Sequence, residues 1–382
     1  MSESQITQHV VLVPGFFGFV NFGPLIYFAH VKEIIEAAFE RHGERVQIHR
    51  VRTGPVASLR QRAGDLLAVI EDEIPPGEPL HIIGHSSGGL DARLLACPGV
   101  DLGAVEVEPI ASRIRSVVTI CTPHCGSPLS DHFVGIIGEP LLRTFSVLTV
   151  IALREGRLPA RLAFRFARAL VGERLLPDTP VHVVLDTLER EAVAELGRAC
   201  GEDDSLRVAD FMKELRRDAH LIPQLAPAAV DLFNAAVVDR PETFYGCVVA
   251  RAPKPKLRSH VSLGLSFYEQ ATHVLFRWLR ERSAPMPRDL EVVPDLAQSV
   301  AMRAAWGEVA RSEDSDGMVP TRSQIHGELI HAATADHLDV IGHFHAPEHE
   351  PPHHDWIAST SRFGRAEFVA LWEAVAHRIL AL

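Results

Sequence analysis

The sequence is poor in cysteine and has no excess of positive charge. Its 382 residues include five cysteines, an odd number, and their spacing is unlike that of metal ligands. We therefore expect reduced thiols that serve packing rather than a disulfide framework. The formal net charge of -11 is spread without long acidic runs, which argues against a nucleic-acid partner.

The chain also lacks a long uninterrupted hydrophobic run. Its longest apolar stretch, residues 133–153, contains Glu139, Pro140 and Arg143, so we expect no transmembrane segment. The N-terminal residues become strand-like by His9 without a basic segment followed by an apolar one. This predicts that the chain has no signal peptide and that the protein is cytoplasmic.

The chain does contain alternating strand-like and helix-like segments. This alternation is typical of an α/β protein with a mostly parallel sheet flanked by helices. The expected strands are residues 9–13, 45–51, 80–83, 114–121 and 243–250, and the expected helices are 26–39, 63–74 and 365–380. Residues 130–241 are largely helical, which predicts a cap inserted between two parts of the core, residues 1–129 and 242–382.

The segment that begins at Leu80, LHIIGHSSGGLDAR, predicts a serine on a sharp turn between a strand and a helix. Gly84 and Gly88 leave room for Ser86 to project its hydroxyl clear of the backbone. The five-residue pattern is common by chance, so the apolar run before it and the small residues after it carry the inference. Ser86 is the predicted nucleophile.

Acyl transfer by serine also needs a base, and an acid that orients this base. In the fold that carries such a turn, the base is a late histidine and the acid lies between it and the serine. His337, shortly before the final helix, is the predicted base. Asp316, in SDGMVP, is the predicted acid, as a strand-end aspartate whose carboxylate turns toward the histidine; Asp314 is the alternative.

The expected oxyanion donors are the backbone N–H groups of Phe16 and Ser87. Ser87 follows the nucleophile, and Phe16 lies in the loop after the first strand, where Gly15 allows a turn. The side chains of Phe16, Phe17 and Phe19 would form an apolar wall near the site. For Phe17 and Phe19, an ordinary core position is the alternative.

Five segments resemble a known family. The bacterial triacylglycerol lipases of the α/β-hydrolase superfamily have, in the same order, segments similar to LVPGFFGF, GHSSGGLDAR, TICTPHCGSP, SDGMVP and DHLDVIG. The resemblance implies an α/β-hydrolase fold with nucleophile Ser86, acid Asp316, base His337, and oxyanion donors Phe16 and Ser87. One departure is Pro14-Gly15, where the family usually has His-Gly.

The resemblance also implies a structural metal. In the family, an aspartate two residues after the catalytic histidine helps to bind calcium, and Asp339 occupies that position. Calcium takes several oxygen ligands. Asp295 is the nearest guess for a second carboxylate, and His343 stands where an oxygen side chain is expected. The chemistry itself requires no cofactor.

Two apolar stretches within the insertion, residues 133–153 and 158–176, concern the substrate. They are candidates for a lid whose apolar inner face covers the site and meets acyl chains; a permanently packed cap is the alternative. The histidine- and proline-rich residues 343–354 are expected to form a solvated loop rather than a metal site.

These observations predict a serine carboxylic-ester hydrolase, similar to a lipase or esterase, that acts through an acyl-enzyme. Its expected partners are an acyl-ester or lipid substrate and, transiently, a lipid interface. An acyltransferase or an aliphatic polyester depolymerase would use the same triad. From a different class, the alternative is a non-catalytic binding protein with a hydrolase fold.

Overall fold

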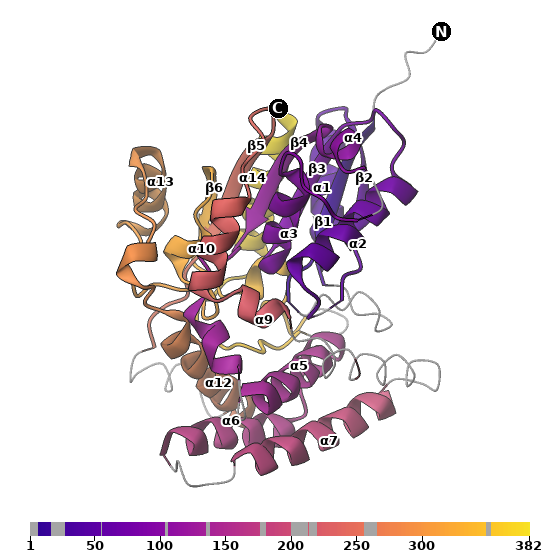
Figure 1. Cartoon of the computed structure of the whole chain (residues 1–382). Coiled ribbons are helices and arrows are strands. Elements are labelled where there is room, and N and C mark those ends of the chain that lie inside the picture. Colours follow the sequence, from indigo (N-terminus) through magenta and orange to yellow (C-terminus); the bar gives the residue numbers. More distant parts are fainter. Residues whose placement is uncertain are drawn as a thin grey trace.

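A parallel sheet forms the centre of the molecule. The computed structural model describes residues 7–16, 27–54, 56–103, 106–134, 138–175, 181–199, 213, 220–255, 266–348 and 353–382. Among these, six strands pair in the order β2-β1-β3-β4-β5-β6, all parallel (Figure 1). They are β1 (Thr7–Val13), β2 (Arg45–Arg50), β3 (Leu80–His85), β4 (Ile114–Ile120), β5 (Phe244–Ala250) and β6 (Glu328–Ala333). The predicted fold class is confirmed.

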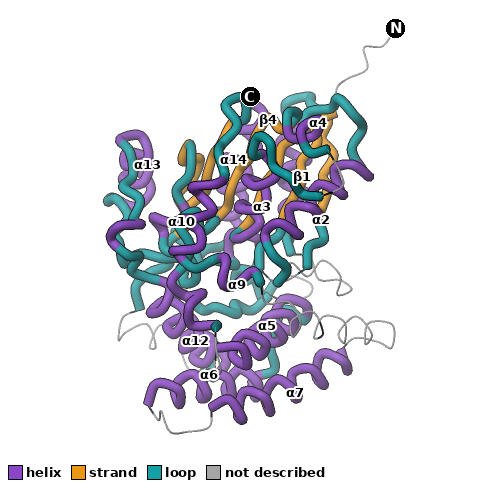
Figure 2. The backbone as a smooth tube through the Cα atoms, in the orientation of Figure 1, coloured by secondary structure: helices purple, strands orange, loops and turns teal. Residues whose placement is uncertain are grey.

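Helices cover both faces of this sheet (Figure 2). One face carries α1 (Val31–Arg41) and α14 (Arg365–Leu380), and the other carries α2 (Leu59–Glu73) and α3 (Ser87–Ala96). On β1, Val10 and Leu12 join the hydrophobic cluster of the first face, whereas Val11 and Val13 join that of the second. Because successive strand residues point to opposite faces, a strand covered on both faces is apolar throughout.

A second layer of helices lies at one end of the sheet (Figure 1). It contains α5 (Gly138–Arg154), α6 (Ala160–Leu175), α7 (Val181–Ala199) and α12 (Phe267–Ser283). The two apolar stretches of the predicted insertion supply α5 and α6. α12 follows residue 241 in the chain, so this layer extends beyond the predicted insertion 130–241.

The remaining described α-helices are short or peripheral. They are α4 (Glu108–Ala111), α9 (Leu221–Gln224), α10 (Pro227–Ala236) and α13 (Leu296–Trp306). α10 belongs by sequence to the predicted insertion, yet Asn234 on it accepts a hydrogen bond from Arg93 of α3 at 2.9 Å. This helix therefore packs beside the core of the protein.

Two differences from the sequence prediction have a clear physical cause. β6 was not predicted, because ELIHAA is a half-exposed edge strand without a run of β-branched residues. The first helix begins at Val31 rather than Ile26: His30 has a φ of 61°, which lies outside the helical region.

Two expectations from composition can be compared with the described residues. Cys97, Cys121, Cys125 and Cys247 have free thiols, and Cys200 lies outside the described part. Among the described helices, none combines the length and the apolar composition that crossing a bilayer requires.

Candidate active site

A sharp turn after β3 carries Ser86 into α3. Ser86 has a φ of 55° and a ψ of -131°, a backbone conformation rare for residues with a side chain. A Cβ at Gly84 would lie 2.4 Å from the carbonyl oxygen of Gly88, and a Cβ at Gly88 would lie 2.4 Å from that of Val13. Packing therefore demands glycine on both sides of this serine.

Ser86 lies where the strand order of the sheet reverses. The chain passes from β1 to β2 on one side and then to β3 on the other, so the carboxyl ends of β1 and β3 flank a topological switch point. Ligands of open parallel sheets bind at such points. Gly15, just after β1, makes close contact here, because a Cβ on it would lie 2.5 Å from Cβ of Ser86. The loop predicted to supply an oxyanion donor therefore runs beside the predicted nucleophile.

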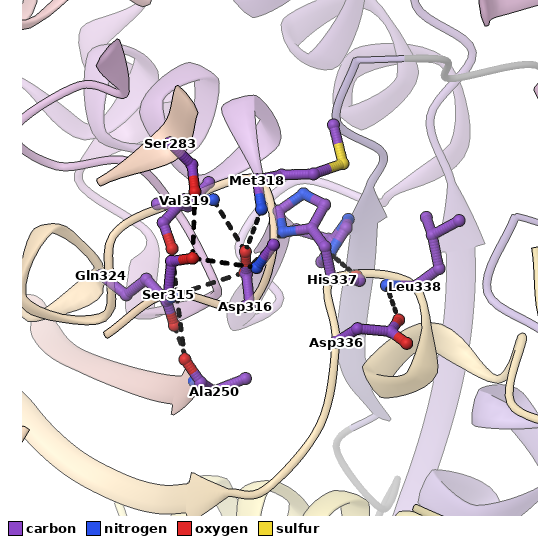
Figure 3. A network of polar contacts seen from close by, with 12 residues as sticks. Ala250, Ser283, Ser315, Asp316, Met318, Val319, Gln324, Asp336, His337 and Leu338 are labelled. Carbon is purple, nitrogen blue, oxygen red and sulfur yellow. Dashed lines mark hydrogen bonds and ion pairs between the residues drawn. The ribbon is translucent and has the colours of Figure 1, made fainter. Parts of the chain in front are cut away.

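His337 follows β6 and is bonded to Asp316. Its Nδ1 lies 2.6 Å from Oδ2 of Asp316, and its backbone N–H donates to the Asp316 carbonyl at 3.1 Å (Figure 3). Since a carboxylate accepts hydrogen bonds, Nδ1 carries the proton and Nε2 offers a lone pair. Two of the predicted site residues are thus brought together.

A turn, not a strand end, holds Asp316. Its Oδ1 accepts the N–H groups of Met318 and Val319 at 2.8 and 2.7 Å, and its Oδ2 accepts the side-chain amide of Gln324 at 3.2 Å (Figure 3). Aspartate commonly bonds to N–H groups a few residues ahead in this way. The prediction that Asp316 lies at the end of a strand is therefore wrong. Within residues 311–320, strand pairing is limited to one isolated bridge, between Ser315 and Pro320.

Asp314, the alternative acid, has other partners. Its carboxylate accepts the N–H of Arg311 at 2.9 Å and pairs with Arg251 at 3.4 Å. These contacts stabilise the turn that contains Asp316. The geometry therefore favours Asp316 as the partner of His337.

Ser86 and His337 line the same cavity. The cavity has a volume of about 50 Å³, and its wall is mostly apolar, with Phe145 contributed by α5. Sites for drug-sized ligands usually have volumes of roughly 300–1,000 Å³. In this structure the helical layer thus leaves room for only a small group beside Ser86.

Both expected oxyanion donors adjoin Ser86. Phe16 lines the cavity, and Ser87 is the first residue of α3. N–H groups in the first turn of a helix have no acceptor within the helix and point toward bound anionic groups. Phe17 and Phe19 lie outside the described residues.

Three residues that contact this site were not predicted from the sequence. Gln324 bonds to Asp316, His85 bonds to the carbonyl of His337 at 3.0 Å, and Tyr27 bonds to His85 at 2.7 Å. His85 lies inside the GHSSG motif, so the sequence already placed it next to Ser86. Nothing in the sequence pointed to Tyr27 or Gln324, because only folding brings them to the site.

Three carboxylates gather beside His337. Asp336, Asp339 and Asp355 each bring one oxygen to within 4.8 Å of the others. Burial raises the pKa of Asp336 to about 6, and burial together with the charge of Asp336 raises the pKa of Asp339 well above its usual range. Within the described part of the chain, no arginine or lysine forms an ion pair with them. Clustered carboxylate oxygens of this kind fit a calcium ion.

The ligand guesses beyond Asp339 need correction. Asp295 caps α13, where its side chain accepts the N–H of Gln298 at 2.8 Å, and Asp355 lies with Asp339 instead. His343 is buried, and its Nε2 bonds to the carbonyl of Tyr27 at 3.0 Å, so the predicted solvated loop is wrong at this end. Both contacts depend on how the loop after His337 folds, so the sequence alone did not predict them.

No protein-family model matches this chain, and no curated protein matches it. Its structure is similar to that of lipase 1 from Pelosinus fermentans, with 16% sequence identity, a TM-score of 0.54, and coverage of 99% of each chain. It is also similar to Staphylococcus hyicus lipase, with 15% identity, a TM-score of 0.50, and coverage of 100% of this chain and 98% of that one. At these identities the likeness concerns the fold: the chain has the α/β-hydrolase fold that these bacterial lipases share.

Proposed function

We propose that this protein hydrolyses carboxylic esters through an acyl-enzyme on Ser86. The observation that carries the proposal is the hydrogen bond from His337 to Asp316, in a cavity that Ser86 also lines. A serine in a strained turn, a histidine with a free Nε2 lone pair and a buried carboxylate are the parts that acyl transfer requires.

In this mechanism, Ser86 Oγ attacks the ester carbonyl while Nε2 of His337 takes its proton. The N–H groups of Phe16 and Ser87 stabilise the oxyanion, and Asp316 stabilises the imidazolium. His337 then returns the proton to the leaving alcohol. Water enters, loses a proton to His337, and releases the acid from Ser86 by the same route.

The apolar wall of the cavity supports an acyl group as the part of the substrate held beside Ser86. Because the cavity is about 50 Å³, we further propose that α5 and its neighbours act as a lid that moves to admit longer chains. A lid that exposes an apolar inner face would bind transiently to a lipid interface. A fixed cap would restrict the enzyme to short esters.

We propose in addition that calcium binds at Asp336, Asp339 and Asp355. The donor chemistry supports this, because Asp336 and Asp339 are buried and Asp355 lies beside them, and buried carboxylates without a neighbouring cation are unfavourable unless protonated or bound to a metal. The ion would take no part in the chemistry. It would join the loop that follows His337 to the segment containing Asp355.

Labelling with a fluorophosphonate probe tests the nucleophile directly. The wild-type protein should be labelled and should hydrolyse p-nitrophenyl butyrate. Ser86→Ala should stay folded, lose labelling, and lower kcat by roughly 10⁴-fold or more, since members of a triad act as a unit. Ser112→Ala, at an exposed serine whose hydroxyl bonds to the Pro109 carbonyl, is the control and should behave as wild type.

The products and the labelling distinguish the alternatives. A labelled protein that transfers its acyl group to an added alcohol faster than to water is an acyltransferase. Release of soluble acids from aliphatic polyester films indicates a depolymerase on the same triad. A folded protein that is neither labelled nor active toward any ester is a binding protein, and this result overturns the proposed function.

A further inference from the structure

A continuous line of hydrogen bonds joins the loop after β1 to the backbone of His337. The N–H of Gly15 donates to the hydroxyl of Tyr27 at 3.0 Å, and this hydroxyl lies 2.7 Å from Nδ1 of His85. Nε2 of His85 lies 3.0 Å from the carbonyl oxygen of His337. Tyr27 and His85 are buried, so water hardly competes for these bonds.

The groups at the two ends fix the direction of the two outer bonds. The carbonyl of His337 can only accept, so Nε2 of His85 carries a proton and donates it. The Tyr27 oxygen accepts the Gly15 N–H, and its own hydrogen can point to Nδ1 of His85 when that ring is neutral. A neutral His85 therefore satisfies all three bonds at once. Burial first, and the neighbouring His337 second, hold the pKa of His85 well below its usual range, in agreement with this assignment.

We propose that Tyr27 and His85 are positioning residues for ester hydrolysis, and that they hold the oxyanion loop and the base His337 in a fixed relation. This inference rests on the proposed function. Both residues act through the groups that they hold and not on the substrate.

The first group that Tyr27 helps to hold is the peptide bond between Pro14 and Gly15. Its N–H donates to Tyr27, and its carbonyl oxygen accepts from Nη2 of Arg62 at 2.5 Å. The next N–H along the chain is that of Phe16, the expected oxyanion donor. Glycine has the greatest backbone freedom of any residue. Fixing both polar atoms of the preceding peptide limits the directions in which the Phe16 N–H can point.

The second group is His337 itself. The ring centroids of His85 and His337 are 4.6 Å apart. When His337 takes the proton from Ser86 it becomes a cation, and a second cation at this distance would oppose it. A neutral His85 avoids the repulsion. From the other side, His343 in the loop after His337 bonds to the Tyr27 carbonyl at 3.0 Å.

A buried tyrosine and histidine might be expected only to fill the core, and kinetics separates this role from positioning. Core filling predicts a loss of stability with an unchanged kcat. Positioning predicts a lower kcat with little change in KM, because the oxyanion contact and the proton transfer are made in the transition state.

Tyr27→Phe is the main test, since it removes the hydroxyl and keeps the ring. We expect kcat on p-nitrophenyl butyrate to fall about 10- to 100-fold with KM within about 2-fold, because the oxyanion donor is loosened and not deleted. Affinity for an alkyl boronic acid, which forms a tetrahedral adduct with serine, should fall by a similar factor. Tyr245→Phe is the matched control: its hydroxyl accepts the N–H of Arg240 at 3.0 Å and lies outside this line, so kcat should not change.

A second pair of variants tests His85. His85→Gln keeps an N–H for the His337 carbonyl and should lose less kcat than His85→Leu, which has none; this pair also decides if Tyr27→Phe does not fold. Wild-type kcat and boronic-acid affinity in Tyr27→Phe, or equal kcat in the two His85 variants, overturn the inference. If the wild-type protein neither hydrolyses esters nor reacts with fluorophosphonate, the proposed function fails, and this inference falls with it.

Discussion

In the proposed mechanism, the position of one proton on His337 decides whether Ser86 has a base. With the proton on Nδ1, bonded to Asp316, the lone pair on Nε2 is available to the serine hydroxyl. Asp316 is fully buried, and two backbone N–H groups hold one of its oxygens while the other faces His337. The orientation of the ring therefore depends on a carboxylate that has no freedom to turn away.

Asp316→Asn should abolish this arrangement without unfolding the protein. An amide can donate to Nδ1 and so favours the tautomer with the proton on Nε2. We expect kcat to fall about 10³- to 10⁴-fold. Asp314→Asn is the matched control, because Asp314 is buried in the same turn but bonds to Arg311 and Arg251.

Steady-state kinetics and thermal melting of both variants check the assignment. Asp314→Asn should lower the melting temperature and leave kcat within about 3-fold of wild type, as expected for a buried ion pair outside the chemistry. An equal loss of kcat in the two variants would contradict a special role for Asp316.

His81 makes stability depend on pH. Burial first, and the nearby Arg115 second, lower its pKa from 6.5 to about 4. Below pH 6.5 the unfolded chain gains a proton at this histidine that the folded protein does not gain until about pH 4. Folding stability is therefore lost as the pH falls through this window, by about 2 kcal/mol at pH 5 for this single group.

Urea unfolding at pH 7 and pH 5 tests the effect of His81. His81→Gln has no group that titrates there, so its free energy of unfolding relative to wild type should rise by about 2 kcal/mol between pH 7 and pH 5. If the two proteins lose the same free energy over this range, His81 titrates alike in the folded and unfolded states.

Among the helices near the candidate site, α5 is a long helix that is buried on nearly all sides. Nearly all of its side chains are buried, and Phe145 on it lines the cavity beside Ser86. Arg143 bonds to Glu189 of α7 at 3.0 Å, and Thr149 accepts from Trp356 at 2.9 Å. A helix that is apolar all round is normally enclosed. If the lid moves, α5 must therefore move together with the helices that cover it.

The loop between β6 and α14 should depend on calcium. An ion bound by Asp336, Asp339 and Asp355 would stabilise the native state by mass action, by about 2.7 kcal/mol when calcium is at 100 times its Kd. Removing calcium with EDTA should lower the melting temperature by several degrees, and adding calcium should restore it.

Two aspartate variants make this experiment specific. Asp355→Asn should melt early and should not respond to EDTA. Asp295→Asn should respond as wild type does, because asparagine can also cap α13 and this residue lies apart from the cluster. If dialysis against EDTA changes neither the melting temperature nor the activity, the proposal of a structural calcium ion is wrong.

For the whole molecule, the relation between the helical layer and the core predicts behaviour at an interface. A mobile layer hides apolar surface in water, and a lipid surface can receive it, so aggregated substrate should favour opening. Hydrolysis of tributyrin should rise sharply once its solubility limit is passed, and esters with eight or more carbons in the acyl chain should be accepted. Ordinary saturation below the limit, with activity on short esters alone, would identify a fixed cap.

The sequence by itself determined the local parts of this protein. Its apolar strand segments separated by helical patterns predicted the parallel sheet, because strands buried on both faces have to be apolar. Gly84-His85-Ser86-Ser87-Gly88 predicted the strained turn, because a side chain at Gly84 would meet the carbonyl of Gly88 within the same turn, whereas the contact of Gly88 with Val13 comes from another strand. The order of serine, aspartate and histidine predicted which polar residues to pair.

Only the tertiary structure decided what approaches these parts from elsewhere in the chain. The edge strand β6 was missed because its pairing with β5, not its composition, makes it a strand. Asp355 was missed as a partner of Asp339, and Tyr27 as a partner of His85, because such contacts depend on how loops close and leave no periodicity in the sequence. Hydrophobic patterning is read along one element, whereas a hydrogen-bonded site is assembled from several, and its partners become known when the packing of those elements is known.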